Sequence, residues 1–105
     1  MLYFLRAEVQ PPDSMSAAEL RRHWNEEAKA ALKAMEAGAI KGLWKVCGQR
    51  VVVGVVDLPD NDMLDQVLDG LPIMQSMGSA VTWEVLPVRP YEHFAEDLRK
   101  AVEGA

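Results

Sequence analysis

One carboxylate in this sequence has a place that suits proton transfer. Glu27 lies in a segment rich in Ala, Glu, Lys and Leu, and at about 100° per residue it falls within an apolar helical stripe. The stripe consists of Leu20, Trp24, Ala28, Ala31 and Met35. A carboxylate that points into apolar surroundings usually has a raised pKa, which prepares it to move a proton. The alternative is a helix-edge carboxylate that pairs with Arg6 or Lys41.

A histidine stands close to this carboxylate in the sequence. His23 precedes Glu27 by four residues, so the two side chains can touch along one edge of a helix. Such a pair can pass a proton between its members. The alternative is a half-buried histidine beside Trp24 with a structural role. The other histidine, His93, is assigned no role.

Other side chains can offer charge or apolar surface to a ligand. Four basic residues on predicted strands are candidates for binding a substrate carboxylate: Arg6, Lys41, Lys45 and Arg50. For most of them the alternative, a charged side chain that is simply exposed to solvent, is the better explanation. Aromatic residues, among them Tyr3 and Trp44, can line a pocket or simply pack in a core. The single cysteine, Cys47, has no neighbour that would activate it. Phosphate-binding loops, dinucleotide fingerprints and metal-ligand clusters are missing from the sequence, so we expect no cofactor.

Length and charge narrow the classes of protein. The 105 residues, half of them hydrophobic and 26% charged, are typical of one globular domain. A formal charge of −5 argues against nucleic acid as a partner. No apolar run approaches the roughly 20 residues that span a bilayer, and the apolar N-terminus is too short for a signal peptide, so we expect a cytoplasmic protein.

The sequence predicts two successive units, each made of strands and one helix. Residues 2 to 9 alternate as a strand does, and Ser16 and Glu19 have the spacing of a capping box for a helix that starts near Ala17 and ends at Gly38. Residues 40 to 47 and 49 to 57 predict a hairpin at Gly48, the second strand being central. A shorter helix ending around Gly70, a loop, and a strand over 81 to 86 follow. Residues 91 to 102 predict a helical arm that docks on its own domain or on a neighbour.

This βαββαβ order predicts an α+β, ferredoxin-like fold over residues 1 to 90, with a C-terminal helical extension over 91 to 105. The four strands form an antiparallel sheet, and both helices lie on one face of it. The other face is left bare and apolar. A second copy of the same sheet can cover it, so we expect a homodimer at least.

Many of these residues together resemble one family. Over roughly residues 1 to 88 the chain resembles muconolactone delta-isomerase, an enzyme of the β-ketoadipate route of aromatic degradation. The matching positions fall into register without gaps: Met1-Leu2, Pro12, Met15, Glu27, Gly38, Leu43-Trp44, Gly48, Asp57, Pro59, Leu64, Leu71-Pro72 and Met77. The resemblance implies subunits that pair through their sheets into a dimeric α+β barrel and assemble further, to decamers in the isomerases.

The resemblance also implies a chemistry. The family's enzymes move a ring double bond in an unsaturated lactone that carries an acetate arm, by removing a proton beside the carbonyl system and returning it elsewhere, without metal or organic cofactor. Glu27 matches an acidic family position, and Arg6 and Lys41 match basic ones that can hold the substrate carboxylate. The isomerases have histidine where this sequence has Phe4, Gly42 and Gln49, and asparagine at Val52, so this pocket is more apolar.

Two functions are therefore expected. The first is a cofactor-free isomerase or cyclase acting on an unsaturated lactone or a related, more apolar carbonyl compound, in aromatic catabolism or, with a changed substrate, in secondary metabolism. Its catalytic residues would be Glu27 and His23, and its substrate would contact Arg6, Lys41, Trp44, Gln49 and Tyr3. The alternative is a non-catalytic relative that binds a small apolar ligand or serves as an accessory subunit of an oligomer.

Overall fold

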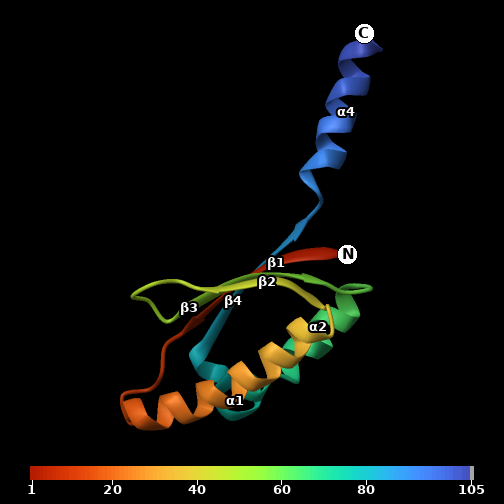
Figure 1. The fold of residues 1–105 in the computed structure, drawn as a ribbon. Coiled ribbons are helices and arrows are strands. Elements are labelled where there is room, and N and C mark those ends of the chain that lie inside the picture. Colours follow the sequence, from red (N-terminus) through yellow and green to blue (C-terminus); the bar gives the residue numbers. More distant parts are fainter. Residues whose placement is uncertain (105) are drawn as a thin grey trace.

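The computed structural model describes residues 1–104, which form a four-stranded sheet covered by helices on one face (Figure 1). The elements are β1 (Leu2–Val9), α1 (Ala17–Glu36), β2 (Ile40–Lys45), β3 (Val51–Asp57), α2 (Asn61–Asp69), α3 (Pro72–Met77), the short 3-10 helix η1 (Gly78–Ala80), β4 (Val81–Val88) and α4 (Tyr91–Glu103). All neighbouring strands are antiparallel, in the order β2-β3-β1-β4. The predicted ferredoxin-like arrangement is confirmed, with β3 inside the sheet.

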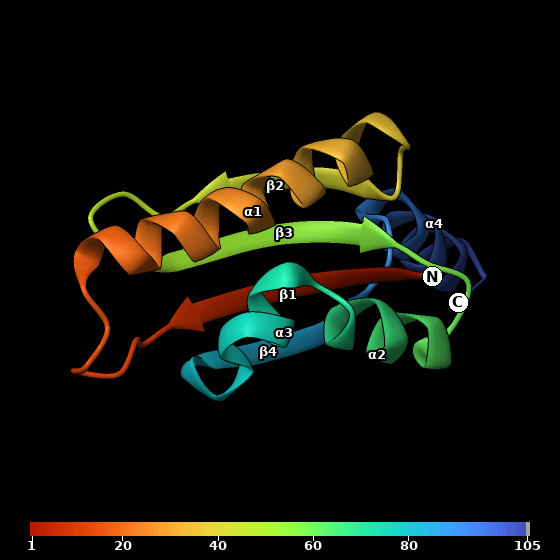
Figure 2. The same ribbon diagram turned by 90° about the horizontal axis from the view of Figure 1, so that it is seen from below.

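The helices divide the covered face between them. Seen from the helical side, α1 runs along β2 and β3, whereas α2 and α3 lie over β1 and β4 (Figure 2). Local sequence explains where α1 and α2 begin. The Ser16 side chain accepts a hydrogen bond from the Glu19 amide at 3.1 Å, and the Asp60 carboxylate accepts one from the Met63 amide at 2.8 Å.

Two predicted details were wrong. The segment after Pro72, expected to be a loop, forms the six-residue helix α3, which begins with a proline in its first turn and buries Ile73 and Met77. The hairpin strands are also shorter than predicted, because residues 46–50 form the connection and Gly48 adopts a φ of +76° there. Both differences affect the site, since α3 and this hairpin border it.

The pairing of the strands assigns each side chain to a face of the sheet. One row on the covered face runs Lys45, Val52, Ala7 and Trp83. The neighbouring row on the open face runs Trp44, Val53, Arg6 and Glu84. Because successive residues of a strand point to opposite faces, Trp44 and Lys45 are separated by the sheet itself.

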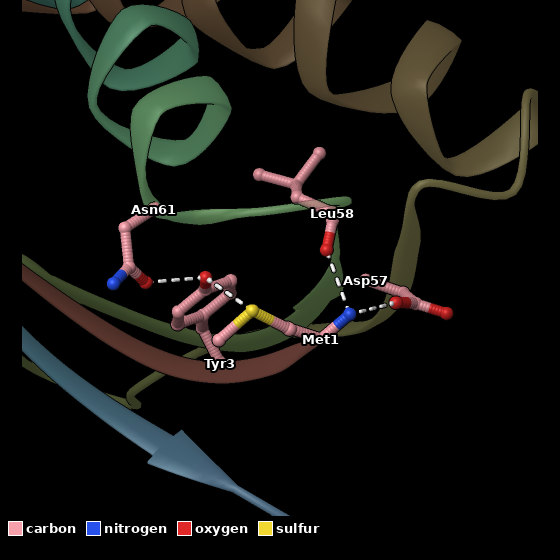
Figure 3. A network of polar contacts seen from close by, with 5 residues as sticks. All are labelled: Met1, Tyr3, Asp57, Leu58 and Asn61. Carbon is pink, nitrogen blue, oxygen red and sulfur yellow. Dashed lines mark hydrogen bonds and ion pairs between the residues drawn. The ribbon is translucent and has the colours of Figure 1, made fainter.

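The core has two parts on the covered face. One joins Val9 and Leu20 to residues of α3 and η1, and the other joins Tyr3, Leu5 and Leu64. Tyr3 is 2% exposed, and its hydroxyl donates to the Asn61 side chain at 2.6 Å (Figure 3). Beside it, the N-terminal amine donates to Leu58 O at 2.7 Å and to the Asp57 carboxylate at 3.1 Å. These bonds tie β1 to the start of α2.

The C-terminal helix α4 stands away from the rest of the molecule. It continues from β4 and projects on the side of the sheet opposite α1, which gives the chain a long dimension of 62 Å (Figure 1). Its apolar residues Tyr91, Phe94, Leu98 and Val102 are exposed. The arm is helical as predicted, but within residues 1–104 it does not dock on its own domain. No helix in this range is both long and apolar enough to cross a membrane.

Candidate active site

A cavity of about 640 Å³ lies between the sheet and the helices. Its walls come from the covered face of the sheet, from α1 and α2, and from Leu71 and Ile73 at the start of α3. Cavities that bind small molecules typically measure about 300 to 1,000 Å³ and are mostly apolar. This cavity is therefore the principal candidate for a ligand site in the described part of the chain.

Small side chains create this space. α1 presents four alanines to it, Ala28, Ala30, Ala31 and Ala34, and the sheet contributes Ala7 and Gly54. Gly54 also allows a close approach, because a Cβ there would lie 2.8 Å from the Leu43 side chain and from the Gly42 carbonyl oxygen. Larger residues at the alanine positions would fill the interior and close the site.

Glu27 reaches this cavity from the middle of α1. Its Oε2 atom is buried and has no hydrogen-bond partner among residues 1–104. Burial raises the pKa of the Glu27 carboxyl above 4.5, and a contact with the Ile73 backbone amide lowers it in part. Ion pairing with Arg6 or Lys41, the alternative suggested by the sequence, is not formed; Arg6 instead lies 3.7 Å from Glu8.

The other predicted catalytic residue does not join Glu27. His23 is half-buried, one helical turn earlier on α1, but it does not line the cavity, and its side chain makes no hydrogen bond to Glu27 within the described residues. Tyr3 belongs to the core near Asn61 and likewise does not line the cavity.

Arg6 and Lys41 both lie away from the cavity. Arg6 is on the open face of β1, so the sheet separates it from the helices. Lys41 is exposed in β2, where the pairing with β3 shifts between Ile40 and Gly42. This bulge interrupts the alternation that would otherwise place Lys41, Leu43 and Lys45 on one face.

Of the remaining predicted contacts, Trp44 borders the cavity and Gln49 does not line it. Trp44 borders the cavity, but its side chain belongs to the open face, where the indole ring lies over Gly42: a Cβ at Gly42 would come 2.4 Å from Cη2 of the ring. Gln49 is an exposed residue of the hairpin connection, and its backbone oxygen accepts a hydrogen bond from Lys45.

Lys45 is the basic residue that the structure brings to the cavity. With Glu27, it makes up the charged side chains of the lining in the described part of the chain. Its Nζ atom donates to Val46 O at 3.0 Å and to Gln49 O, so the ammonium group lies at the hairpin connection. The sequence presented Lys45 as one of four basic candidates. The register of β2 singles it out.

The described residues contain no group of three or more His, Cys, Asp or Glu side chains that could hold a metal ion. In the described residues, the arrangement offers an apolar, partly enclosed space with one carboxylate on a helix, whose Oε2 atom has no hydrogen-bond partner, and one ammonium group on a strand. A carboxylate in such a place can accept and return a proton.

The fold and the site define a ferredoxin-like α+β domain with an acidic residue in an apolar cavity. A family model described as muconolactone delta-isomerase matches residues 1–93. The chain therefore belongs to the muconolactone delta-isomerase family, as its sequence suggested.

Individual relatives agree with this family. The muconolactone delta-isomerase of Cupriavidus pinatubonensis is 30% identical over 82 residues, which cover 78% of this chain and 89% of the relative. That of Acinetobacter baylyi is 26% identical over 77 residues, covering 73% and 80%. A crystal structure of muconolactone isomerase at 3.3 Å resolution superposes with a TM-score of 0.72 at 23% identity, over 86% of this chain and 90% of that one, which supports the same fold.

Proposed function

We propose that this protein is a cofactor-independent isomerase or cyclase that shifts a proton and a double bond in an unsaturated lactone or a related carbonyl compound. The observation that carries the proposal is the buried, unpartnered Oε2 atom of Glu27 in an otherwise apolar cavity. A buried carboxylate oxygen without a hydrogen-bond partner destabilises a fold. Such an oxygen is therefore expected where a bound substrate supplies the missing partner. The family names of the relatives point to the same chemistry.

The proposed reaction needs one group that moves a proton. The Glu27 carboxylate removes a proton from the carbon next to the carbonyl system, and the electron pair enters the conjugated π system as an enolate. The glutamic acid then returns the proton to a different carbon of the same molecule, so the double bond moves and no net proton is consumed. A cation near the enolate oxygen would stabilise the developing charge.

His23 has a secondary place in this scheme. One turn from Glu27, it would reach the carboxylate only if its side chain rotated into the cavity, and Glu27 can carry out both transfers alone. Among the other predicted contacts, Trp44 borders the cavity, whereas Arg6, Lys41, Tyr3 and Gln49 do not line it.

We also propose that the functional unit is a homodimer formed through the open sheet face. The central row of that face is apolar, with Val55, Phe4 and Leu86 side by side on β3, β1 and β4. A second copy of the sheet would bury this row, as in a dimeric α+β barrel.

A second function is supported by the lining of the cavity. Apart from Glu27 and Lys45 the described lining is uncharged and mostly aliphatic, which also suits a protein that only binds an apolar ligand or serves as an accessory subunit. The two functions differ in whether a substrate is turned over.

The deciding experiment follows the conversion of muconolactone and of more apolar unsaturated lactones by absorbance, with the Glu27→Gln variant. General base catalysis contributes about 100-fold to 10,000-fold, so the variant should lose activity by that factor while its circular dichroism stays unchanged. Glu26→Gln, which alters an exposed carboxylate one residue earlier, is the matched control. Equal activity of Glu27→Gln and the parent protein would overturn the proposal, and a folded parent protein that binds but converts none of the lactones supports the second function.

A further inference from the structure

The two ends of the cavity differ in charge and in hydrogen-bonding capacity, and this limits what it can hold. Lys45 lies at the hairpin connection, at one end of a row that continues through Val52 and Ala7 to Trp83. Two of its three N–H groups donate to the backbone oxygens of Val46 and Gln49. One N–H and the positive charge are left for a ligand.

The rest of the lining offers little to polar atoms. The covered face contributes Leu5, Ala7 and Val52, and α1 contributes its alanines with Leu32 and Met35. The indole N–H of Trp83 already points to the Met74 sulfur at 3.2 Å. An oxygen-rich ligand would lose water at several oxygens without gaining partners, at a cost for each of them.

Glu27 limits the negative charge that a ligand in this cavity can carry. Glu27 is on α1, and a second anionic group of a ligand placed near it would be repelled. A single anionic group is therefore best placed at Lys45, with the uncharged part of the molecule between the sheet and α1.

We infer that the cavity binds a molecule with one carboxylate on a largely hydrocarbon body, and that Lys45 binds the carboxylate. The inference rests on the proposed function only in using the same cavity, because it concerns binding and not turnover. It gives the anion-binding role to Lys45, which lines the cavity, and not to Arg6 or Lys41.

Tryptophan fluorescence can test this directly. The chain has three tryptophans, and all three border the cavity, although the Trp44 ring lies on the open face over Gly42. In a Trp44→Phe background the emission comes from Trp24 and Trp83 and reports on the covered side of the cavity. Cyclohexylbutanoate and the uncharged cyclohexylbutanamide are suitable probes, because they share a hydrocarbon body and do not absorb at tryptophan wavelengths.

We expect the carboxylate to bind more tightly than the amide, and Lys45→Met to weaken carboxylate binding about threefold to fivefold, in line with an ion pair near the surface. Amide binding should stay the same in this variant, which also shows that the cavity is intact. Lys33→Met, an exposed lysine of α1 outside the lining, is the matched control and should bind both probes as the parent does.

Equal affinity for the two probes, or a preference for the carboxylate that survives Lys45→Met, would overturn the inference. Tight binding of a small oxygen-rich lactone such as muconolactone in place of the cyclohexyl probes would overturn the part that concerns the hydrocarbon body. None of these results depends on catalysis, so they remain distinct from a failure of Glu27 to move a proton.

Discussion

The two faces of the sheet use similar residues for different purposes. The covered side places Glu27 and Lys45 around a cavity with aliphatic walls, and the Oε2 atom of Glu27 has no hydrogen-bond partner among residues 1–104. The open face has the basic residue Arg6 within 3.7 Å of Glu8, next to apolar residues that nothing covers in one chain. Of the two charged groups on the covered side, Glu27 is half-buried, and burial raises the pKa of its carboxyl, whereas Lys45 is exposed at the hairpin connection.

This difference shows why composition alone is a poor guide to the site. Arg6 and Lys45 are both basic strand residues, and only the direction of the side chain separates them. Lys45 is itself exposed, and Arg6 is half-buried, so burial of the charge does not distinguish them. Lys45 borders the cavity, where its charge can reach a ligand, whereas the sheet separates Arg6 from the cavity.

The open face can be disrupted by introducing charge. Leu86→Lys places an ammonium group in the central apolar row, where Leu86 is 47% exposed, so folding of one chain should be preserved. If a second copy covers this row, the variant should weaken the dimer by about 30-fold or more, since burying an unpaired charge costs at least as much as losing an interface hot spot. Sedimentation velocity over a dilution series measures this.

The control for this variant is Met63→Lys, which puts the same charge on an exposed residue of α2 on the covered side. It should leave the mass unchanged. A parent protein that sediments as a monomer, or a Leu86→Lys variant that sediments as the parent does, contradicts pairing through the open face.

Sequence patterns predicted the covered face well because they follow local rules. Alternation over residues 2 to 9 and the helical spacing around Glu27 are short-range signals, and the Ser16 cap needs only Glu19. The helix α3 was missed because six residues with Gln75 and Ser76 among them show no clear periodicity, although Pro72 marks its start. Lys45 could not be separated from Lys41, because strict alternation places both on one face and only the pairing with β3 reveals the shift at Lys41.

A larger side chain in the cavity should interfere with ligand binding on the covered side. Ala31→Leu adds a branched side chain to the wall of the cavity, at a half-buried position of α1. We expect at least a tenfold loss of affinity for an apolar ligand such as cyclohexylbutanamide, while the melting temperature stays the same or rises, because the added methyl groups pack into empty space. Calorimetric titration and thermal unfolding measure the two quantities.

Ala18→Leu is the matched control for this substitution, because Ala18 is an exposed alanine of the same helix that does not line the cavity. It should change neither affinity nor melting temperature appreciably. Unchanged affinity in Ala31→Leu would show that ligands bind elsewhere, for example on the open face.

The smallest expected effect concerns the charge of Glu27 itself. Burial raises its pKa in the folded protein above 4.5, so the folded state binds this proton more tightly than the unfolded state does. The resulting stabilisation is fully present below pH 4.5 and is lost as the pH rises through the folded-state value. Above that value the parent protein holds a partly buried charge that Glu27→Gln lacks, and the contact with the Ile73 backbone amide offsets its desolvation only in part.

The melting temperature of Glu27→Gln should therefore match that of the parent at low pH and exceed it increasingly as the pH rises. Because the side chain is only partly buried, we expect a small difference, and Glu26→Gln corrects for the change in net charge at the exposed surface of the same helix. A parent protein that gains stability over Glu27→Gln with rising pH would mean that the carboxylate finds a partner on the covered face. In that case Glu27 would resemble Arg6 and Glu8 on the open face, and the main difference between the two faces would disappear.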